Sequence, residues 1–540
     1  MSFSAEKDVK LPTHHNESID DAVVEVMRDQ QTGEISEAAV RAEGEEKVTF
    51  FVWVLVLASS YDTGVISGTL VTIGSDLGPE QLSNTQKELI TSATTLGALL
   101  GGLAAGMISD FVGRKPVLAA ANVVFIGGAI AQAVCHTVAA MIGGRFLIGI
   151  GVGLAACMAP LFIAELSPTK LRGRLVTVNV VFITGTLIWV FLQHHLTGFF
   201  FFFFFIKKGG QVIAYGIGAA FESSPGGWRW MVGLGAVPAA LQLAMLPFMP
   251  ESPRILVRRG HLEQAQKNMA KIYAYATPEQ VVQKVKLLRA SVQESIDIQN
   301  STTFLQRFKS IVTVPVNRRA LIVACGLQGF QQLCGFNTLV YYSATLFKSI
   351  GFDKPTAVGL IIAGTNFIFT MIALKYIDII GRRKIMLFTP PGMIFGLVLA
   401  SVSFYYLTKN TGGVLVDGAK YPKSWSSLVL FSMQSELFAL DVRGIGASIA
   451  TSANWAANLV IGATYLSLMH AITPSGAFGF YAGLCLLGWL FCIFCYPETA
   501  GLSLEEVRLI FRNDFGIKAS ERLRATKREL RERGNEPESP

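Results

Sequence analysis

The residue with the clearest capacity for chemistry is an acid inside an apolar segment. Asp62 lies within a hydrophobic run that extends from about 48 to 71. A charge at the centre of a bilayer costs roughly 2.5–3.5 kcal/mol on insertion scales, so such a group needs a partner or a proton. Arg145, early in a later apolar run, is the candidate partner.

This pair has two interpretations. A carboxyl group whose pKa rises on burial and falls beside a guanidinium group can take up a proton on one side of a membrane and release it on the other. Asp62 and Arg145 would then couple a proton to a transport step. The alternative is a permanent ion pair that only holds two helices together.

A second group of candidates consists of carboxamides inside apolar segments. Gln331, Gln332 and Asn337 lie in one predicted span, over 320–346, and at roughly 100° per residue they can share one broad face. Carboxamides both donate and accept hydrogen bonds, which suits vicinal hydroxyls without placing a charge in lipid. The alternative is hydrogen bonding between helices with no ligand. Other apolar segments add Gln211, Asn366 and Asn454.

A third group consists of charged residues at the ends of apolar segments. Exposed ion pairs contribute little stability each, but a network that changes between two states biases their equilibrium. We expect this network to gate one face of the protein, and the alternative is that its members only anchor the helix ends. The members are Asp110, Arg114, Glu165, Arg172, Glu251, Arg254, Asp378, Arg382, Glu436, Arg443 and Glu498.

The composition indicates which kind of structural element positions these residues. Of 540 residues, 51% are hydrophobic and 16% are charged, against about 25% charged in soluble proteins. Apolar runs close to the bilayer-spanning length of about 20 residues recur from Val48 to Tyr496. The chain is therefore predicted to be an all-α polytopic membrane protein, and a soluble enzyme, a secreted disulfide domain and a disordered protein are excluded.

The net charge of +8 follows topology, because the basic residues cluster in short loops between apolar runs. It does not indicate nucleic-acid binding. By the positive-inside rule these loops and both tails are cytoplasmic. We find no phosphate-binding loop, metal cluster or nucleophile elbow, so we expect no enzyme activity, no metal and no cofactor.

The runs divide the chain into two halves of six predicted spans. A soluble, partly helical loop separates the halves, and polar tails flank them. The predicted divisions are a tail at 1–47, an N-terminal bundle at 48–250, the loop at 251–319, a C-terminal bundle at 320–496 and a tail at 497–540.

Three motifs recur in the same order in both halves. Asp110-Phe-Val-Gly-Arg-Lys returns as Asp378-Ile-Ile-Gly-Arg-Arg-Lys, Glu165 with Arg172 returns as Glu436 with Arg443, and Pro250-Glu251 returns as Pro497-Glu498. Two homologous six-helix bundles with a site between them near the midplane form a secondary-transporter architecture.

The motifs resemble those of the sugar porter family of the major facilitator superfamily. The matching strings are YDTGVISG (61–68), GMISDFVGRK (106–115), GGRFLIGIGVGL (143–154), ELSPTKLRGR (165–174), PESPR (250–254), QQLCGFNTLVYY (331–342), DIIGRRK (378–384) and PETAG (497–501). Within the family, the chain looks most like proton-coupled myo-inositol transporters.

The resemblance implies a fold and roles. It implies a twelve-span major facilitator fold, proton coupling at Asp62 tuned by Arg145, and a plasma-membrane location. It also implies that H⁺ is the coupling ion and that a small polyol or sugar is the partner besides the lipid bilayer. Positions that match Gln211, Gln331, Gln332, Asn337 and Asn454 contact the substrate in the family.

The chain departs from the family pattern in the fifth predicted span. Residues 186–209, which include seven consecutive phenylalanines, interrupt it, and removal of this segment restores the family string ITGGQVIAYG. Glu165 and Glu251 are 86 residues apart and their counterparts Glu436 and Glu498 only 62, a difference equal to the 24 inserted residues. We hypothesise a translated retained intron. The alternative is a genuine extra apolar segment.

The second departure is a tenth span that is too short. Only the nine residues WSSLVLFSM (425–433) separate the polar loop at 408–424 from Gln434, too few to cross a bilayer. Relative to the family, a segment of about 17 residues is missing near 433–434, so the chain as written lacks one wall of the pocket.

These observations predict proton/myo-inositol symport. Three alternatives stay open: a hexose or other polyol porter of the same fold, a non-transporting nutrient sensor, and an inert product of mis-splicing.

Overall fold

The structure is a computed structural model of the chain. The residues that it describes are 61–166, 216–218, 220–221, 224–273, 276–301, 304–352, 355, 359, 361–362, 365, 382–413, 415, 445–499 and 510–534.

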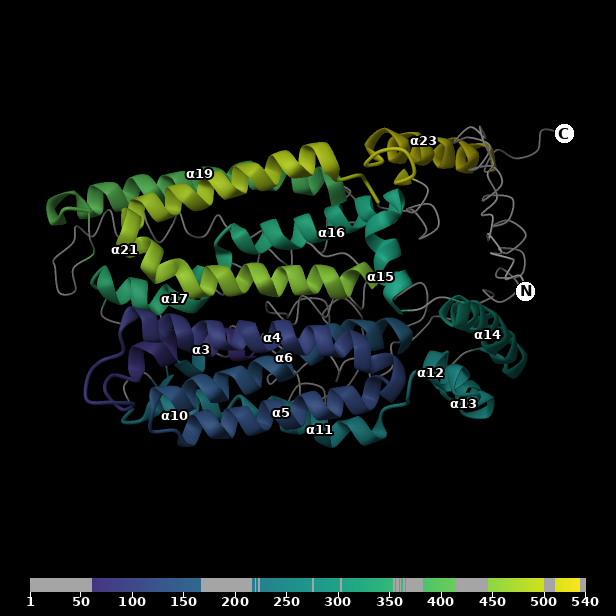
Figure 1. Cartoon of the computed structure of the whole chain (residues 1–540), viewed down its shortest axis with the longest axis horizontal. Coiled ribbons are helices and arrows are strands. Elements are labelled where there is room, and N and C mark those ends of the chain that lie inside the picture. Colours follow the sequence, from purple (N-terminus) through teal and green to yellow (C-terminus); the bar gives the residue numbers. More distant parts are fainter. Residues whose placement is uncertain are drawn as a thin grey trace, which may run out of the picture.

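Long helices lie in two stacked groups with nearly parallel axes (Figure 1). The N-terminal group contains α3 (Tyr61–Thr72), α4 (Asn84–Val112), α5 (Arg114–Val134), α6 (Val138–Leu166), α10 (Gly227–Gly233), α11 (Ala236–Met245) and the short 3₁₀ helix η2 (Leu246–Phe248). The C-terminal group contains α16 (Pro315–Leu333), α17 (Phe336–Ser349), α19 (Arg382–Thr408), the 3₁₀ helix η3 (Lys409–Thr411) and α21 (Ile445–Cys495).

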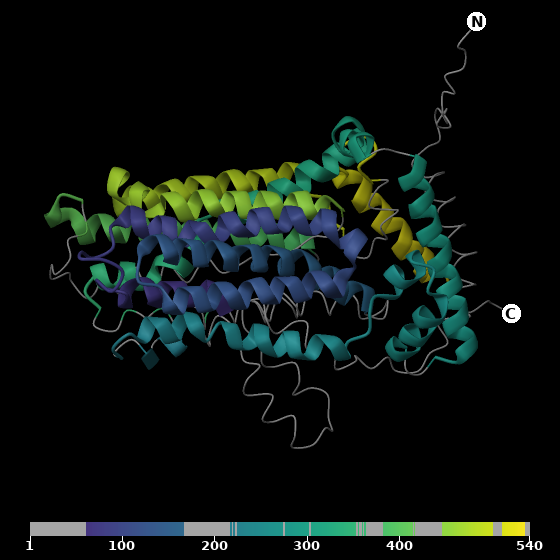
Figure 2. The ribbon, with the colours of Figure 1, turned by 60° about the horizontal axis from the view of Figure 1, so that its bottom comes forward.

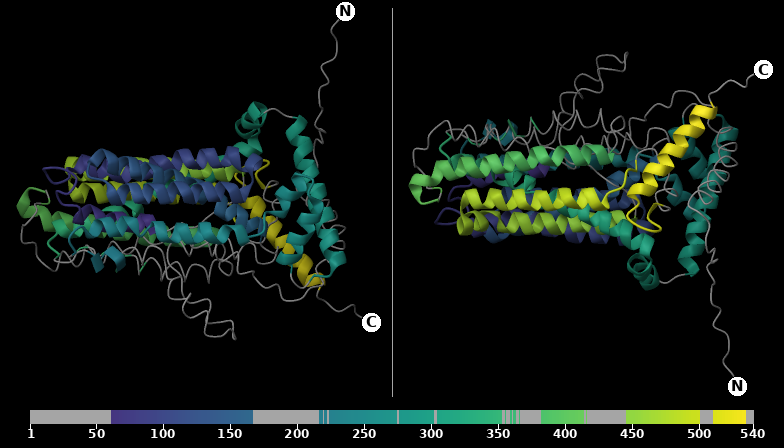
Figure 3. Two further views of the ribbon diagram at one scale, coloured as in Figure 1. Left: turned by 90° about the horizontal axis from the view of Figure 1, so that it is seen from below. Right: turned by 90° about the horizontal axis from the view of Figure 1, so that it is seen from above.

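Further helices lie across one end of both groups, as Figures 2 and 3 show from other sides. They are α12 (Pro253–Arg258), α13 (Leu262–Ile272), α14 (Pro278–Ser301), α15 (Phe304–Thr313) and α23 (Ile517–Gly534). We call the end of the bundles that carries these helices the proximal end and the opposite end the distal end. The sequence predicts that the proximal end is cytoplasmic.

Two local sequence features set the ends of α4. Ser83 and Gln86 form a capping box, in which the Ser83 side chain accepts from the Gln86 N–H and the Gln86 side chain accepts from the Ser83 N–H. This arrangement satisfies two of the N–H groups that a helix start leaves without partners. At the other end, Gly113 adopts a φ of 98°, and α5 begins at the next residue.

Glycines bring α4 and α6 into backbone contact. A Cβ atom placed on Gly149 would lie 2.2 Å from the carbonyl oxygen of Thr94, and one on Gly153 would lie 2.2 Å from that of Ala98. The glycine-rich string at 143–154 therefore serves helix packing, which is the use that small residues have in membrane helix pairs.

α21 contains two spans joined by a break. Ile472 and Thr473 have non-helical dihedral angles, and Thr473 has a φ of 67°. The second helix then starts at Pro474, which lacks an N–H, and the Thr473 hydroxyl accepts from the Gly476 N–H at 3.3 Å. The two predicted spans, 445–470 and 475–496, agree with this division.

The distal end is closed by a hydrophobic core with contributions from both bundles. Ile66 and Leu70 of α3 belong to the same buried cluster as Tyr342 of α17 and Tyr465 of α21. The Tyr342 and Tyr465 rings are stacked, with centroids 5.5 Å apart. This cluster joins the two bundles by apolar contact at the distal end.

Six helices of the described part are long and apolar enough to cross a membrane. The predicted spans 88–109, 117–136, 138–163 and 385–407 begin and end within four residues of α4, α5, α6 and α19. Several predicted features lie largely or wholly outside the described residues: the fifth, eighth and tenth spans, both departures from the family pattern, and the tail at 1–47. The predicted domain boundaries therefore stay predictions.

Candidate functional site

Carboxamides from three helices of the C-terminal bundle, α16, α17 and α21, lie close together. Asn454 of α21 donates from Nδ2 to the Gln328 Oε1 at 2.7 Å, and the Gln331 Oε1 lies 3.5 Å from the same nitrogen. Asn337 of α17 donates to the Gln332 Oε1. These side chains are partly exposed, so hydrogen-bonding groups remain accessible to a ligand with hydroxyl groups. We call the five residues the carboxamide cluster.

The helix that carries most of this cluster is broken, which corrects one prediction. A continuous span was expected over 320–346, but α16 ends at Leu333 and α17 begins at Phe336. Gly335 makes the break with a φ of 89°, and a Cβ there would lie 2.9 Å from the Tyr481 ring. Only glycine suits both conditions. The helical-wheel argument therefore does not apply across the break, yet Gln332 and Asn337 still meet.

Asn458 supplies a further polar group one turn along α21. Its Nδ2 donates to the Tyr341 hydroxyl at 3.0 Å, and both residues are buried. Sequence reasoning missed Gln328 and Asn458. Each had a signal, since Gln328 precedes Gln331 by three residues and Asn458 follows Asn454 by four, which are the spacings of one helix face.

Arg145 lies in the second turn of α6 and is 1% exposed. A buried guanidinium group at this depth agrees with the need for a charged partner. Asp62 lies in the first turn of α3, and its side chain is outside the described set. The pairing of the two residues stays a prediction.

At the proximal end of the N-terminal bundle, Arg114 and Glu165 form a two-pronged ion pair. Arg114 Nη2 lies 3.0 Å from Glu165 Oε1, and Nε donates to Oε2 at 3.2 Å. Arg114 also donates to the Ser109 carbonyl at 2.8 Å and is 5% exposed. The pair joins α5 to α6 within one bundle.

The C-terminal bundle also has a buried acid at this end, Glu498, which is the repeat counterpart of Glu251. Glu498 accepts from the Arg383 backbone N–H at 3.1 Å, and Arg524 of α23 lies 3.9 Å from the same carboxylate oxygen. Glu498 is 3% exposed. Glu251 accepts from the Ser252 N–H at 3.1 Å, and Arg254 is exposed on α12. The gating role of these residues remains a prediction.

Two cations that sequence reasoning left out occupy matching places in the repeat. Lys115 donates from Nζ to the carbonyls of Pro247 and Met249 at 3.0 and 2.8 Å. The Arg383 guanidinium donates to the carbonyls of Cys492, Ile493 and Tyr496. Both residues cap the C-terminal end of the sixth helix of their bundle. The sequence feature that could have identified them is their shared position in the repeat, two residues after Gly113 and Gly381.

The remaining predicted residues cannot be compared with the structure. Asp110 lies near the end of α4 and Arg382 begins α19, without described side chains. The residues outside the described part of the chain are Gln211, Asn366, Arg172, Asp378, Glu436 and Arg443.

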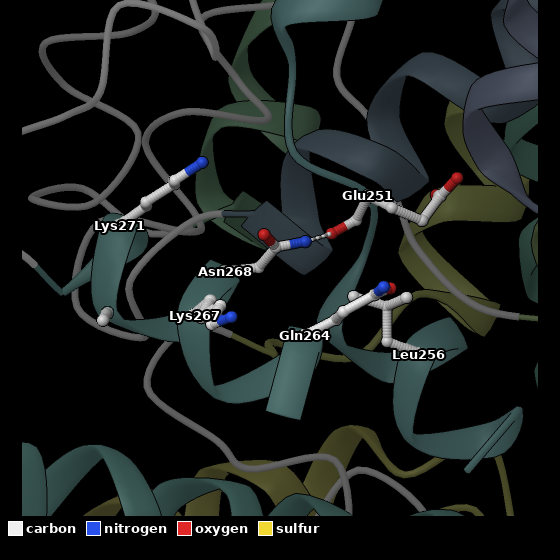
Figure 4. Close-up of a pocket in the computed structure, with 7 residues that line it drawn as sticks. Glu251, Leu256, Gln264, Lys267, Asn268 and Lys271 are labelled. Atoms are coloured by element: carbon white, nitrogen blue, oxygen red, sulfur yellow. Dashed lines mark hydrogen bonds between the residues drawn. The ribbon is translucent and has the colours of Figure 1, made fainter. Parts of the chain in front are cut away.

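A cavity lies at the proximal end, away from the carboxamide cluster. It has a volume of about 440 Å³ and is lined by Glu251, Leu256, Gln264, Lys267, Asn268, Ala270 and Lys271. Figure 4 shows Asn268 facing the backbone carbonyl of Glu251, to which its Nδ2 donates at 2.9 Å, while the Glu251 carboxylate points away. The cavity is an open depression beside short helices, so its size does not make it the substrate site.

No group of three or more His, Cys, Asp or Glu side chains comes together within the described residues.

The family model described as "Sugar (and other) transporter" matches residues 48–511. The chain belongs to this family. It is 53% identical to the Myo-inositol transporter 1 of Cryptococcus neoformans var. grubii over 96% of this chain and 91% of that one. It is 40% identical to the Myo-inositol transporter 1 of Saccharomyces cerevisiae, over 88% of this chain and 80% of the relative.

Solved structures share the fold. The major facilitator superfamily proton:xylose symporter XylE, bound to 6-bromo-6-deoxy-D-glucose, matches with a TM-score of 0.64 and 25% identity, over 85% of this chain and 98% of that one. The inward-open conformation of XylE from E. coli matches with a TM-score of 0.62, 25% identity and coverage of 85% and 97%. The predicted all-α major facilitator fold is confirmed: the chain is a multi-pass membrane transporter of the sugar porter family and not an enzyme.

Proposed function

We propose that the chain is a proton-coupled symporter of myo-inositol that works by alternating access in the plasma membrane, with both termini in the cytoplasm. The carboxamide cluster carries this proposal. A cyclic polyol presents hydroxyl groups that donate and accept, and neutral carboxamides match both functions without a charge in the membrane. The two relatives named as myo-inositol transporters favour this polyol over a hexose.

The substrate would enter the cluster by replacing the hydrogen bonds that its members make with each other. Asn454 exchanges its bond to Gln328 for a substrate hydroxyl, and Asn337 exchanges its bond to Gln332. Exchange of equivalent bonds has little net cost, so binding is reversible. A transporter needs this property, because it must also release its cargo.

We assign the proton to Asp62 and its control to Arg145. Protonation of Asp62 removes its attraction to the guanidinium group, and loss of the proton restores it. The buried position of Arg145 supports this role, because its charge stays unscreened by bulk water and acts strongly on a nearby carboxyl group.

The test measures uptake of radiolabelled myo-inositol by yeast cells that lack their own inositol uptake. We expect accumulation above the external concentration at pH 5.5, and a protonophore should abolish it. Asp62→Asn should abolish accumulation while inositol exchange across the membrane persists. Concentrative uptake by this variant would refute the coupling role.

Substrate binding has its own matched control. Loss of one partner of a hydrogen bond costs about 1–3 kcal/mol when it leaves the other unsatisfied, so Asn337→Ala and Gln332→Ala should raise the KM about tenfold. Gln293→Ala removes a carboxamide that bonds Asp297 on α14, outside the bundles, and should leave the KM unchanged. Inhibition by glucose stronger than by unlabelled inositol would favour a hexose porter.

Both the full chain and a version without 186–209 are needed in this experiment. Uptake by the shortened chain alone would support the retained-intron hypothesis. Absence of uptake by both would refute transport by this chain and favour a sensor or an inert product.

A further inference from the structure

The distal end of the interface holds a buried acid that the proposed coupling and binding steps do not use. Glu88 lies in the second turn of α4 and is 4% exposed. Burial of a carboxylate is costly unless it is hydrogen-bonded, and acids within membrane-spanning helices are rare. The start of α4 does not need Glu88, because Ser83 and Gln86 already cap it. The position of Glu88 therefore requires another explanation.

The hydrogen-bond donor to Glu88 belongs to the other bundle. Ser467 of α21 donates its backbone N–H to Glu88 Oε1 at 2.7 Å and its hydroxyl to Oε2 at 2.6 Å. One residue thus satisfies both oxygens of the carboxylate. Hydrogen bonds to an ionised acceptor are about twice as strong as neutral ones. Both bonds require α4 and α21 to be in contact.

A second polar bridge joins the bundles at the same end. The hydroxyls of Ser67 on α3 and Ser343 on α17 lie 3.0 Å apart, and Ser67 also accepts from the Ala344 N–H at 3.0 Å. Ser67 and Ser343 are fully buried. Among the described residues, these two polar bridges flank the apolar cluster at the distal end, and of the two only the Glu88 bridge contains a charge.

We propose that Glu88 is the gating residue of the distal side, and this proposal rests on the alternating-access mechanism proposed above. While the distal side is closed, Ser467 satisfies the carboxylate. When the bundles part, water replaces Ser467. Glu88→Ala deletes an interaction that exists in the closed state only, so it shifts the equilibrium toward the distally open state.

The test follows the opening of the distal side without any substrate. Leu70 is 4% exposed in the buried cluster, one turn along α3 from Ser67. In a Leu70→Cys background, purified protein in detergent is treated with a maleimide, and peptide mass spectrometry gives the labelled fraction at position 70. Native cysteines are then distinguished by their peptides. Glu88→Ala should raise the labelling rate at least fivefold.

Three further variants separate the bridge from a general loss of packing. Glu88→Gln should label faster than the background but more slowly than Glu88→Ala, because its amide can accept from the Ser467 N–H and donate to the hydroxyl, but with weaker neutral bonds. Thr95→Ala removes a buried hydroxyl that donates to the Ser92 carbonyl within α4, and it should stay within twofold of the background. Ser467→Ala keeps the backbone bond and should lie between the background and Glu88→Ala.

The double variant Glu88→Ala, Ser467→Ala should label no faster than Glu88→Ala, because the Ser467 hydroxyl no longer has its carboxylate partner. A rate for Glu88→Ala within twofold of Thr95→Ala would overturn the proposal, as would equal rates for Glu88→Ala and Glu88→Gln. The readout needs no inositol. Failure of inositol uptake with the expected labelling pattern would count against the substrate alone, and failure of the labelling pattern would count against the gate alone.

Discussion

The contact between α4 and α6 allows a quantitative prediction about the replacement of Gly149 by alanine. The added Cβ atom would lie 2.2 Å from the Thr94 carbonyl oxygen and 3.0 Å from the Gly97 Cα. Both obstacles are backbone atoms, so no side-chain rotation relieves them. The helices must separate by roughly 1 Å, and a gap of that size forfeits up to about half of the dispersion energy of each separated atom pair.

The expected cost follows from this separation. Overpacking costs about 1–3 kcal/mol when side chains can adjust. Because the obstacle here is backbone, we expect Gly149→Ala to lower the free energy of unfolding by about 3 kcal/mol. For a unit of 150–250 residues, each kcal/mol lowers the melting temperature by about 2–4 °C. The N-terminal bundle should therefore unfold about 6–12 °C lower in the variant.

Gly143 on the same helix is the matched control. No atom lies within 4 Å of a Cβ placed there, and alanine is favoured over glycine in a helix by up to about 1 kcal/mol. Gly143→Ala should thus unfold at or slightly above the temperature of the unmodified protein. The measurement is thermal unfolding in detergent, followed by tryptophan fluorescence. Melting temperatures of the two variants within 2 °C of each other would refute the packing argument.

Three more predictions concern other parts of the chain. Glu165→Ala should destabilise the fold by about 3–5 kcal/mol, because the Arg114 guanidinium loses its buried partner. In thermal unfolding, the double variant with Arg114→Ala should lose less stability than the two single variants lose in sum. Asp76→Ala should cost about 1–3 kcal/mol, because the fully buried Trp228 loses the acceptor of its Nε1–H at 2.7 Å, and Asp76→Asn, which keeps an acceptor, should unfold at a higher temperature than Asp76→Ala. Sequencing of full-length transcripts should show that most lack the codons for 186–209 and carry extra apolar codons after Met433; transcripts that match the printed chain would contradict the splicing hypothesis.

The sequence predicts the described spans well because lipid imposes a simple requirement. A helix that crosses the bilayer must be apolar for about 20 residues, so the runs near 88–109, 117–136 and 138–163 marked α4, α5 and α6. Their ends are less predictable. The backbone hydrogen bonds of a helix continue into the polar interface, where residues such as Asn84 and Arg114 look like loop residues by hydropathy.

The candidate site was predictable in type more than in geometry. Carboxamides in apolar segments stand out because polar groups are expensive there, and Gln331, Gln332, Asn337 and Asn454 do come together as a group. The break at Gly335 was not predictable, since a glycine inside an apolar run is equally compatible with a continuous helix. Only the approach of the Tyr481 ring shows why the helix stops there.

Glu88 was missed for a different physical reason. An acid close to the end of a predicted span is normally solvated at the membrane surface, so hydropathy assigns it no cost. Its burial depends on Ser467, which lies 379 residues away in the sequence. No local pattern contains that information.

The two cations that cap the sixth helices, Lys115 and Arg383, restrict how the molecule can deform. Each ties the turn between the second and third helices of its bundle to the C-terminal end of that bundle's sixth helix. Helix ends joined in this way move together at the proximal end and do not separate from each other. Movement is then concentrated at the interface between the two bundles, so the binding of a solute acts on that interface and does not loosen either bundle.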